Sequence, residues 1–198
     1  MLSNEWKKVE QVLKKGGVVV IPTDTLYGIV ARALDEKAVE KVYVIRKRSE
    51  KKPCIVLITS LSDLGKFQIK ISKEQKVFLN TVWPNKVSVI LSCPEKKFEY
   101  LHRGTKTIAF RMIGPRSGHL FELIKRVGPI VAPSANPQGL APARNRREAR
   151  NYFGDSVDAY LCYGTREGKP STLVSIDTKG IHILREGVVK IQVPAQKK

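Results

Sequence analysis

The sequence predicts a single α/β (or α+β) domain built on a twisted, open, mixed β-sheet with helices on its faces. Two observations support this fold class. Short apolar runs typical of strands alternate with amphipathic helical segments early in the chain, and the end of the chain is rich in strand patterns. The length of 198 residues is enough for one domain with a real core. We expect residues 1–195 to form this domain and residues 196–198 to be a disordered tail.

The first part of the chain predicts two helices and two strands. A first helix begins near Ser3 and ends at Gly16, and the run VVVI (18–21) follows it as a buried strand. Asp35 opens a second helix, in which apolar residues recur at helical spacing. The apolar run PCIVLI (53–58) predicts the next strand. This alternation is the pattern expected for helices packed on a sheet.

The rest of the chain predicts three further helices and a series of strands. Ser72 and Gln75 fit a capping box that starts a helix running through Val82. Two more helices are expected at 117–127 and 146–153, separated in part by a loop at 134–144. The expected strands are 87–92, 107–112, 130–133, 157–162, 172–177, 181–185 and 188–192.

The chain is strongly basic. It has 36 Lys and Arg against 18 Asp and Glu, a formal net charge of +18 and a pI near 10.0. This imbalance favours polyanionic partners such as RNA, DNA or nucleotide phosphates. The start of the chain has no apolar signal core, and the longest purely aliphatic run, 18–21, is far shorter than the roughly 20 residues of a membrane span. We therefore expect a cytoplasmic protein with no membrane association.

Generic catalytic and metal-binding patterns are absent from the sequence. No C-x-x-C pair and no metal-ligand spacing of histidines occurs, so we expect reduced cysteines and no protein metal site. The segment GTREGKPS (164–171) resembles a P-loop, but it has one residue too few between its glycines, and Pro170 separates the Lys from the Ser. The cysteines of the chain are Cys54, Cys93 and Cys162, and its histidines are His102, His119 and His182.

Polar segments stand at the ends of several expected strands, where open α/β sheets bind ligands. Taken singly, each has an ordinary explanation: a turn, a solvated basic stretch, or an edge position for the charged residue Arg111. Their number in one short chain favours a functional site. They are PTDTLYG (22–28), RKRSEKKP (46–53), TIAFRM (107–112), PSANPQG (133–139), and KPSTLV (169–174) with ILREG (183–187).

The order of these motifs resembles that of a known family. P-T-D-T-x-Y-G, a K-x-R-like motif ending in K-P, T-x-A-x-R, S-x-N-x-x-G, K-P-S-T and L-R-x-G follow one another from about Val18 to Val189. This order and spacing are similar to those of the YrdC-like family, the threonylcarbamoyl-AMP synthases, in their single-domain form. The resemblance implies a YrdC-like fold with a basic concave face and a nucleotidyltransferase that joins L-threonine, bicarbonate and ATP, releasing pyrophosphate.

The resemblance also implies partners. The product would supply the threonylcarbamoyl group for adenosine 37 of tRNAs that read ANN codons, with a downstream transferase machinery and direct RNA or tRNA binding as further expectations. Mg²⁺ would be bound mainly through ATP, because this ion usually relies on substrate phosphates. The work of the protein would be positioning and charge neutralisation, which Arg and Lys can supply without a catalytic histidine.

Site residues are carried over motif by motif. The resemblance implies that Arg46, Arg48 and Lys52 hold the ATP phosphates, Arg48 and Lys52 being the catalytic pair. Arg111 would pair with the threonine carboxylate in the bidentate manner typical of Arg. The remaining nucleotide-site residues would be Thr107, Ser134, Asn136, Arg144 and Arg185. The remaining threonine-site residues would be Thr25, Tyr27 as a wall, and Ser171.

The chain departs from the family pattern at several positions, and two other functions remain open. Arg46 stands where Lys is usual, and Asn85 replaces the Gly of W-P-G. Further departures are Ser49, Ile113, Ser175 and Glu186. Since a fold can host several activities, the alternatives are an RNA-binding or ribosome-associated module without adenylation and a diverged carbamoyl-transfer paralogue. The high positive charge suits the first of these.

Overall fold

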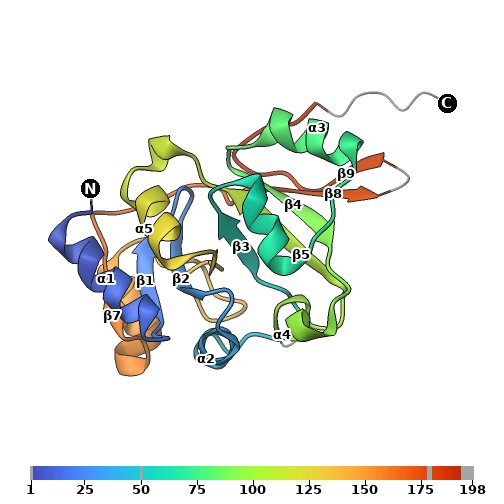
Figure 1. The fold of residues 1–198 in the computed structure, drawn as a ribbon. Coiled ribbons are helices and arrows are strands. Elements are labelled where there is room, and N and C mark those ends of the chain that lie inside the picture. Colours follow the sequence, from blue (N-terminus) through green and yellow to red (C-terminus); the bar gives the residue numbers. More distant parts are fainter. Residues whose placement is uncertain (1, 50, 178–179, 193–198) are drawn as a thin grey trace.

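A computed structural model describes residues 2–49, 51–177 and 180–192. These residues form a nine-stranded sheet in the order β7-β1-β2-β6-β3-β5-β4-β8-β9 (Figure 1). Three pairs are parallel, β1–β7, β3–β5 and β4–β8, and the others are antiparallel. The strands are β1 Val19–Pro22, β2 Tyr27–Arg32, β3 Ile55–Ile58, β4 Val87–Ser92, β5 Thr107–Met112, β6 Ile130–Val131, β7 Ala159–Tyr160, β8 Thr172–Asp177 and β9 Gly180–Arg185.

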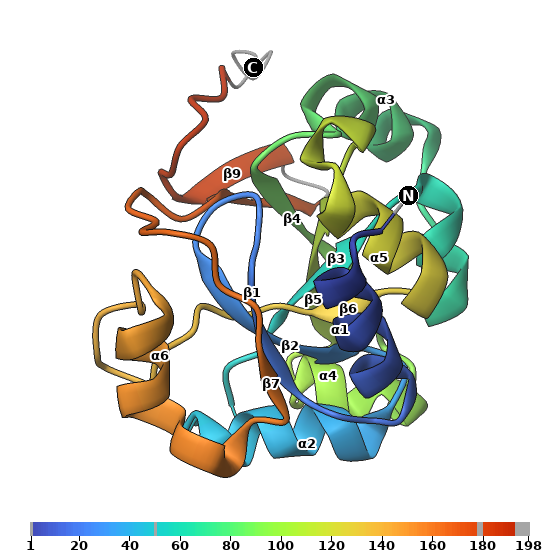
Figure 2. The same ribbon diagram turned by 90° about the vertical axis from the view of Figure 1, so that its left-hand side faces the viewer.

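Helices cover the sheet from two sides. Helices α1 and α5 lie side by side, and α2 packs against β2 and α4 (Figure 2). No helix in the described ranges is long and apolar enough to cross a membrane. The α-helices are α1 Asn4–Lys14, α2 Glu36–Ile45, α3 Lys73–Val82, α4 Glu99–His102, α5 His119–Val127 and α6 Arg146–Phe153. The 3-10 turns are η1 Leu61–Phe67, η2 Lys96–Phe98, η3 Pro115–Ser117 and η4 Gly154–Ser156.

Two apolar cores lie on opposite faces of the sheet. Because successive side chains of a strand point to opposite faces, Val56 joins the core that contains α2 and η1, while its neighbour Leu57 joins the core formed with α1 and α5. On β5, Ile108 and Phe110 belong to the first of these cores. The alternation therefore directs Arg111 to the other face, which matters for the site described below.

The predicted fold class, an α/β domain with a mixed sheet and flanking helices, is confirmed, and most elements fall where the sequence placed them. Helix-capping side chains explain part of this success: the Asp35 side chain accepts from the N–H of Ala38, and Ser72 and Gln75 form a capping box at the start of α3. Strands 87–92, 107–112 and 172–177 and helix 146–153 have the predicted bounds. The boundary of the predicted tail at 196–198 lies outside the described residues.

Strand β2 was not predicted. It follows the polar turn 23–26 directly and forms a hairpin with β1. Its apolar run Ile29–Ala31 is short and adjoins the polar motif, so it gives only a weak strand signal. All but its last residue are buried, so it has no polar alternation to reveal a strand. The helical turns η1 and η2 with α4 were also not expected.

The predicted strand at 188–192 is wrong. The sheet ends at β9, and the next backbone donors bind elsewhere: the N–H of Gly187 donates to Thr172 Oγ1 and that of Val188 to the carbonyl of Pro170. Other predicted elements are shorter than expected. The strand predicted at 53–58 begins at Ile55. The strands predicted at 130–133 and 157–162 are reduced to two residues each, and Gly118 separates η3 from the start of α5.

Candidate functional site

Arg111 forms the floor of a small cavity of about 80 Å³. Its side chain is almost completely buried, with 3% of the residue exposed, and Nη2 donates to Asp24 Oδ1 at 2.8 Å. Nε is inaccessible to solvent and has no hydrogen-bond partner among the described residues. Burial lowers the pKa of the guanidinium and nearby Arg185 adds to this, while Asp24 opposes it. Arg keeps its proton in proteins, so a buried positive charge lines the cavity.

The cavity brings together six of the predicted site residues from five separate parts of the chain. Its volume is well below the roughly 300–1,000 Å³ of typical ligand pockets, so it can enclose only part of a nucleotide-sized ligand. The predicted residues that line it are Thr25, Tyr27, Arg111, Ser134, Ser171 and Arg185.

Hydroxyl groups line the sides of the cavity. Ser171 is buried, and its Oγ lies 2.9 Å from Ser88 Oγ. On the other side, Thr25 Oγ1 lies 3.3 Å from Thr23 Oγ1, which itself donates to the carbonyl of Leu26. These hydroxyls can donate to or accept from a polar ligand held on Arg111.

Arg185 lies at the rim of the same cavity. Nη2 and Nε donate to the Ser171 carbonyl at 2.9 and 3.2 Å, and partial burial lowers the pKa of the guanidinium. The end of β9 is thereby fixed against the segment that precedes β8. The guanidinium-bearing residues Arg111 and Arg185 thus both line one small cavity.

Arg46 supports the Ser134–Asn136 loop from below. It is 2% exposed, and its Nε donates to the Asn136 carbonyl at 2.9 Å while Nη2 reaches Asn136 Oδ1 at 3.3 Å. Burial and the neighbouring Arg48 lower the pKa of Arg46 to about 10. Asn136 in turn donates to the carbonyl of Leu140 at 2.7 Å. Within the described parts of the chain, Nη1 is the one nitrogen of the Arg46 guanidinium without a partner, so most of this group is bonded to the loop.

The basic segment that follows α2 lies outside the small cavity. Arg48 donates from Nε to the Lys52 carbonyl and from Nη2 to the Pro53 carbonyl, both at 2.9 Å. The Lys52 side chain is exposed and makes no hydrogen bond or ion pair within the described parts of the chain. The predicted phosphate role of both residues stays a prediction.

Two further predicted residues do not reach the cavity. Thr107 lies at the opposite end of β5 from Arg111, four residues or roughly 13 Å away on the same face, and its hydroxyl bonds to Thr105 at 3.2 Å. Arg144 is exposed and forms ion pairs with Glu148 at 2.9 Å and Glu167 at 3.1 Å. Their predicted place in a nucleotide site stays a prediction.

Tyr27 forms a wall of the cavity and anchors the segment 163–170, which we call the strap. The phenol is fully buried and donates to the carbonyls of Tyr163 at 2.8 Å and Gly164 at 3.0 Å. Burial raises the pKa of Tyr27, so the hydroxyl stays a donor. Arg166 Nη1 adds a bond to the Thr23 carbonyl at 3.0 Å, which ties the strap to the turn 23–26.

Sequence reasoning did not assign roles to Asp24, Ser88 or Arg166. Asp24 stands inside a motif already singled out, but its pairing with Arg111 joins residues 87 positions apart. Ser88 was detectable as a hydroxyl among the apolar residues of the strand VSVILS, whose other serine, Ser92, is its exposed last residue. Arg166 lies in the segment 164–171, which resembles a P-loop, and the sequence gives no sign of its bond to the Thr23 carbonyl.

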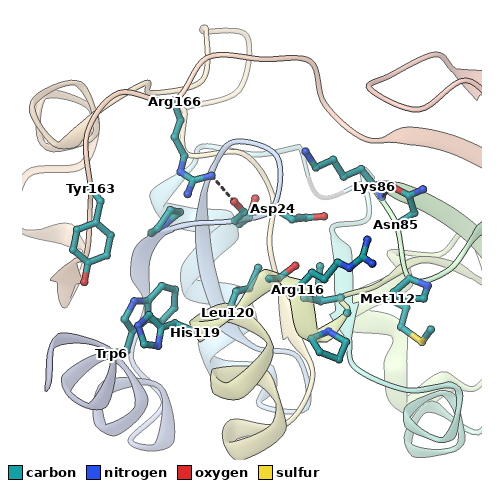
Figure 3. A pocket seen from close by; sticks show the side chains of 18 residues that line it. Trp6, Asp24, Asn85, Lys86, Met112, Arg116, His119, Leu120, Tyr163 and Arg166 are labelled. Atoms are coloured by element: carbon teal, nitrogen blue, oxygen red, sulfur yellow. Dashed lines mark hydrogen bonds between the residues drawn. The ribbon is translucent and has the colours of Figure 1, made fainter. Parts of the chain in front are cut away.

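A second, larger pocket of about 1,050 Å³ adjoins the small cavity (Figure 3). Thr23 lines both, Asp24 lines the large pocket, and Thr25 and Leu26 line the small cavity, so the turn 23–26 is a shared wall. The lining of the large pocket includes Lys86, Arg116 and Arg166, and none of the predicted site residues.

The chain is similar in sequence to a known family and to proteins of that family. The family model named for Sua5, YciO and YrdC, and described as telomere recombination, matches residues 11–187. The threonylcarbamoyl-AMP synthase of Pyrococcus abyssi is 30% identical over 193 residues, which cover 95% of this chain and 56% of that protein. The enzyme of the same name from Bacillus subtilis is 31% identical over 188 residues, covering 93% and 54%. The chain thus spans about half the length of these two relatives.

Solved structures agree with the fold. The structure of P. abyssi Sua5 complexed with L-threonine superposes with a TM-score of 0.84 at 27% identity, covering 94% of this chain and 56% of that one. Escherichia coli YciO superposes with a TM-score of 0.80 at 23% identity over 94% of this chain and 90% of its own, a likeness of fold alone.

Proposed function

The chain belongs to the Sua5/YciO/YrdC family, and we propose that it is a threonylcarbamoyl-AMP synthase. In this reaction the amine of L-threonine and bicarbonate form a carbamate with loss of water, and the carbamate and ATP then give threonylcarbamoyl-AMP and pyrophosphate. The observation that carries the proposal is the small cavity, which a buried guanidinium lines together with several hydroxyls. Such a site suits a small ligand that has both a carboxylate and a hydroxyl group, as threonine has.

The threonine carboxylate would bind to Arg111. Asp24 occupies Nη2 and so fixes the plane of the guanidinium, whose charge would attract an incoming carboxylate. A charge-assisted bond of this kind is stronger than a neutral one and depends on orientation. Thr25 and Ser171 would supply hydroxyl partners, and Tyr27 would close one wall.

ATP would lie on the open face next to the small cavity, which is too small to hold it. Ser134 and Arg185 line the rim and would contact the part of the nucleotide nearest to threonine. Arg48 and Lys52 would bind the phosphates, and Arg46 would act chiefly by holding the Ser134–Asn136 loop. Thr107, Asn136 and Arg144 complete the proposed set.

Mg²⁺ would be held mainly by ATP oxygens, where it would neutralise phosphate charge. In the described ranges, no group of three or more acidic, histidine or cysteine side chains is arranged to hold a metal ion. Asp24, the carboxylate nearest the cavity floor, is already bonded to Arg111.

The proposed chemistry requires positioning more than covalent help. A carbamate oxygen of N-carboxy-threonine attacks the α-phosphorus of ATP, the bond from that phosphorus to the bridging oxygen breaks, and pyrophosphate leaves with that oxygen. Holding the two reactants together can supply much of the rate enhancement, and cations stabilise charge that develops on the phosphate oxygens. The arginines of the site are suited to both tasks.

We extend the proposal to the role of the product in the cytoplasm. Threonylcarbamoyl-AMP would serve the modification of adenosine 37 in tRNAs reading ANN codons, through a downstream transferase. The net charge of +18 supports direct contact with RNA, which also makes an RNA-binding module without adenylation the second candidate.

The test is pyrophosphate release by the purified protein in the presence of ATP and Mg²⁺, with threonine and bicarbonate each added or left out. Release that needs both substrates, and that is lost in Arg111→Ala, is the expected result. An inactive protein that binds RNA would favour the second candidate. An inactive protein that still binds ATP would indicate a diverged carbamoyl-transfer paralogue.

A further inference from the structure

We propose that the large pocket of Figure 3 is a second anion-binding site that takes a ligand with a diphosphate group. This inference does not rest on the proposed synthase activity. It rests on the charge, the geometry and the size of the pocket.

The pocket gathers positive charge that the protein itself leaves largely unneutralised. Lys86 precedes β4, Arg116 lies in the turn between β5 and α5, and Arg166 belongs to the strap. Within the described ranges, Lys86 Nζ and the Arg116 guanidinium have neither a hydrogen bond nor an ion pair. The single carboxylate of the lining, Asp24, is committed to Arg111. Cations facing one concave surface attract and concentrate anions.

The arrangement of the cations suits a ligand with more than one phosphate group. Figure 3 shows Lys86 and Arg116 on one side of the pocket and Tyr163 on the opposite side, with Arg166 next to Asp24. An Arg fork binds two oxygens of one phosphate, whereas Lys acts as a point charge. Cations that come from separate elements can therefore each bind a different phosphate of one ligand.

The start of α5 provides a supporting contribution. Gly118, the residue that caps this nine-residue helix, offers no side-chain acceptor to the first-turn N–H groups. Gly118, His119 and Leu120 all line the pocket. The free N–H groups and the positive end of the helix dipole therefore lie beside Lys86 and Arg116, and both favour an anion there.

The volume fits the ligand class. About 1,050 Å³ is at the upper end of the range for small-molecule pockets, so a pyrophosphate ion or a nucleoside diphosphate can enter. Two of the positions at which the chain departs from the usual family motifs, Asn85 and Ile113, line this pocket. The lining of the large pocket therefore departs from the usual family motifs, whereas none of the departing positions lines the small cavity.

The experiment is isothermal titration of the full chain with inorganic pyrophosphate, without ATP, threonine or Mg²⁺. The double variant Lys86→Ala/Arg116→Ala is expected to weaken binding at least tenfold. The matched control is Lys125→Ala/Arg126→Ala, which removes the same charge from exposed positions in the last turn of α5, the helix whose first turn lines the pocket. This variant is expected to change affinity less than twofold.

Pyrophosphate is also the product of the proposed reaction, so Arg48→Ala is included to weaken the proposed ATP phosphate site. Binding that survives in Arg48→Ala and is lost in the Lys86/Arg116 variant supports the proposal. It is overturned if the Lys86/Arg116 variant binds as the parent does, or if the control loses as much affinity. Arg116→Ala alone, at an exposed position, guards against misfolding of the double variant.

ADP titrated into the same variants identifies the source of the diphosphate. A tenfold loss for both ligands in the Lys86/Arg116 variant assigns the pocket to nucleoside diphosphates as well as pyrophosphate. A loss for pyrophosphate alone assigns it to the free ion. Because these titrations contain no threonine, failure of the proposed synthase activity would leave their result unchanged.

Discussion

The small cavity and the large pocket share the turn 23–26 but hold their cations in opposite ways. In and beneath the small cavity, Arg111 and Arg46 are buried and hydrogen-bonded to protein groups. At the large pocket, the side chains of Lys86 and Arg116 have no partner among the residues that the structure describes. A buried paired cation is part of the fold, whereas a free one at a pocket is available to a ligand. Substitutions should therefore cost stability at the first site and affinity alone at the second.

The largest effect is expected for Arg111→Ala. The variant leaves Asp24 as a largely buried carboxylate without its partner, which should cost about 3–5 kcal/mol in the free energy of unfolding. Threonine-dependent pyrophosphate release should be lost as well. Urea unfolding and the release assay measure the two effects.

The double variant Asp24→Asn/Arg111→Met separates these effects, since it removes both charges. We expect it to recover most of the stability and none of the activity. Recovery of threonine-dependent turnover would contradict the role of Arg111 in binding the carboxylate.

The next largest effect is expected for Arg46→Ala. The loss of the charged donor leaves the Asn136 carbonyl and Oδ1 without their bonds, at a cost of about 1.5–3 kcal/mol. Because the Ser134–Asn136 loop would loosen, the KM for ATP should rise while the KM for threonine changes little. Arg46→Lys, the residue usual in the family, should restore part of both losses. An unchanged KM for ATP would show that the loop is held by other contacts.

A smaller effect is expected for Ser171→Ala. The buried Ser88 hydroxyl would lose its partner at 2.9 Å, which costs about 1–3 kcal/mol. The KM for threonine should also rise severalfold. Ser88→Ala/Ser171→Ala removes both hydroxyls and should regain stability without regaining threonine affinity. If both properties recover together, Ser171 serves packing alone.

The smallest effect on stability is expected for Arg116→Ala. This exposed side chain has no partner in the described parts of the chain, and surface substitutions of this kind usually stay within about 0.5 kcal/mol. Thermal unfolding checks the value. A loss as large as that of Arg46→Ala would remove the distinction between the two cavities.

Much of the fold could be predicted because its signals are local. Apolar runs set most strands, and capping side chains that accept from the backbone N–H three residues later set the starts of α2 and α3. Strand β2 was missed because it is buried on both faces and follows a polar turn. The strand expected at 188–192 failed because its residues have an apolar pattern but no neighbouring strand to pair with.

The candidate site was predictable in its residue types and not in its contacts. Motif order indicated Arg111 and Ser171, and the structure brings both to one cavity. The pairing of Arg46 with Asn136 joins residues 90 positions apart, and that of Ser88 with Ser171 joins residues 83 apart. Such contacts depend on strand order, which no local pattern contains.

The turn 23–26 has a consequence for protein engineering, since both cavities use it as a wall. A substitution at Thr23 or Asp24 affects both cavities at once, because Thr23 lines both and Asp24 lines the large pocket while it binds Arg111 of the small cavity. Directed evolution of either cavity should therefore leave this turn alone and randomise the outer walls, at Ser171 for one and at Arg116 for the other. Libraries built in this way can change the two cavities independently.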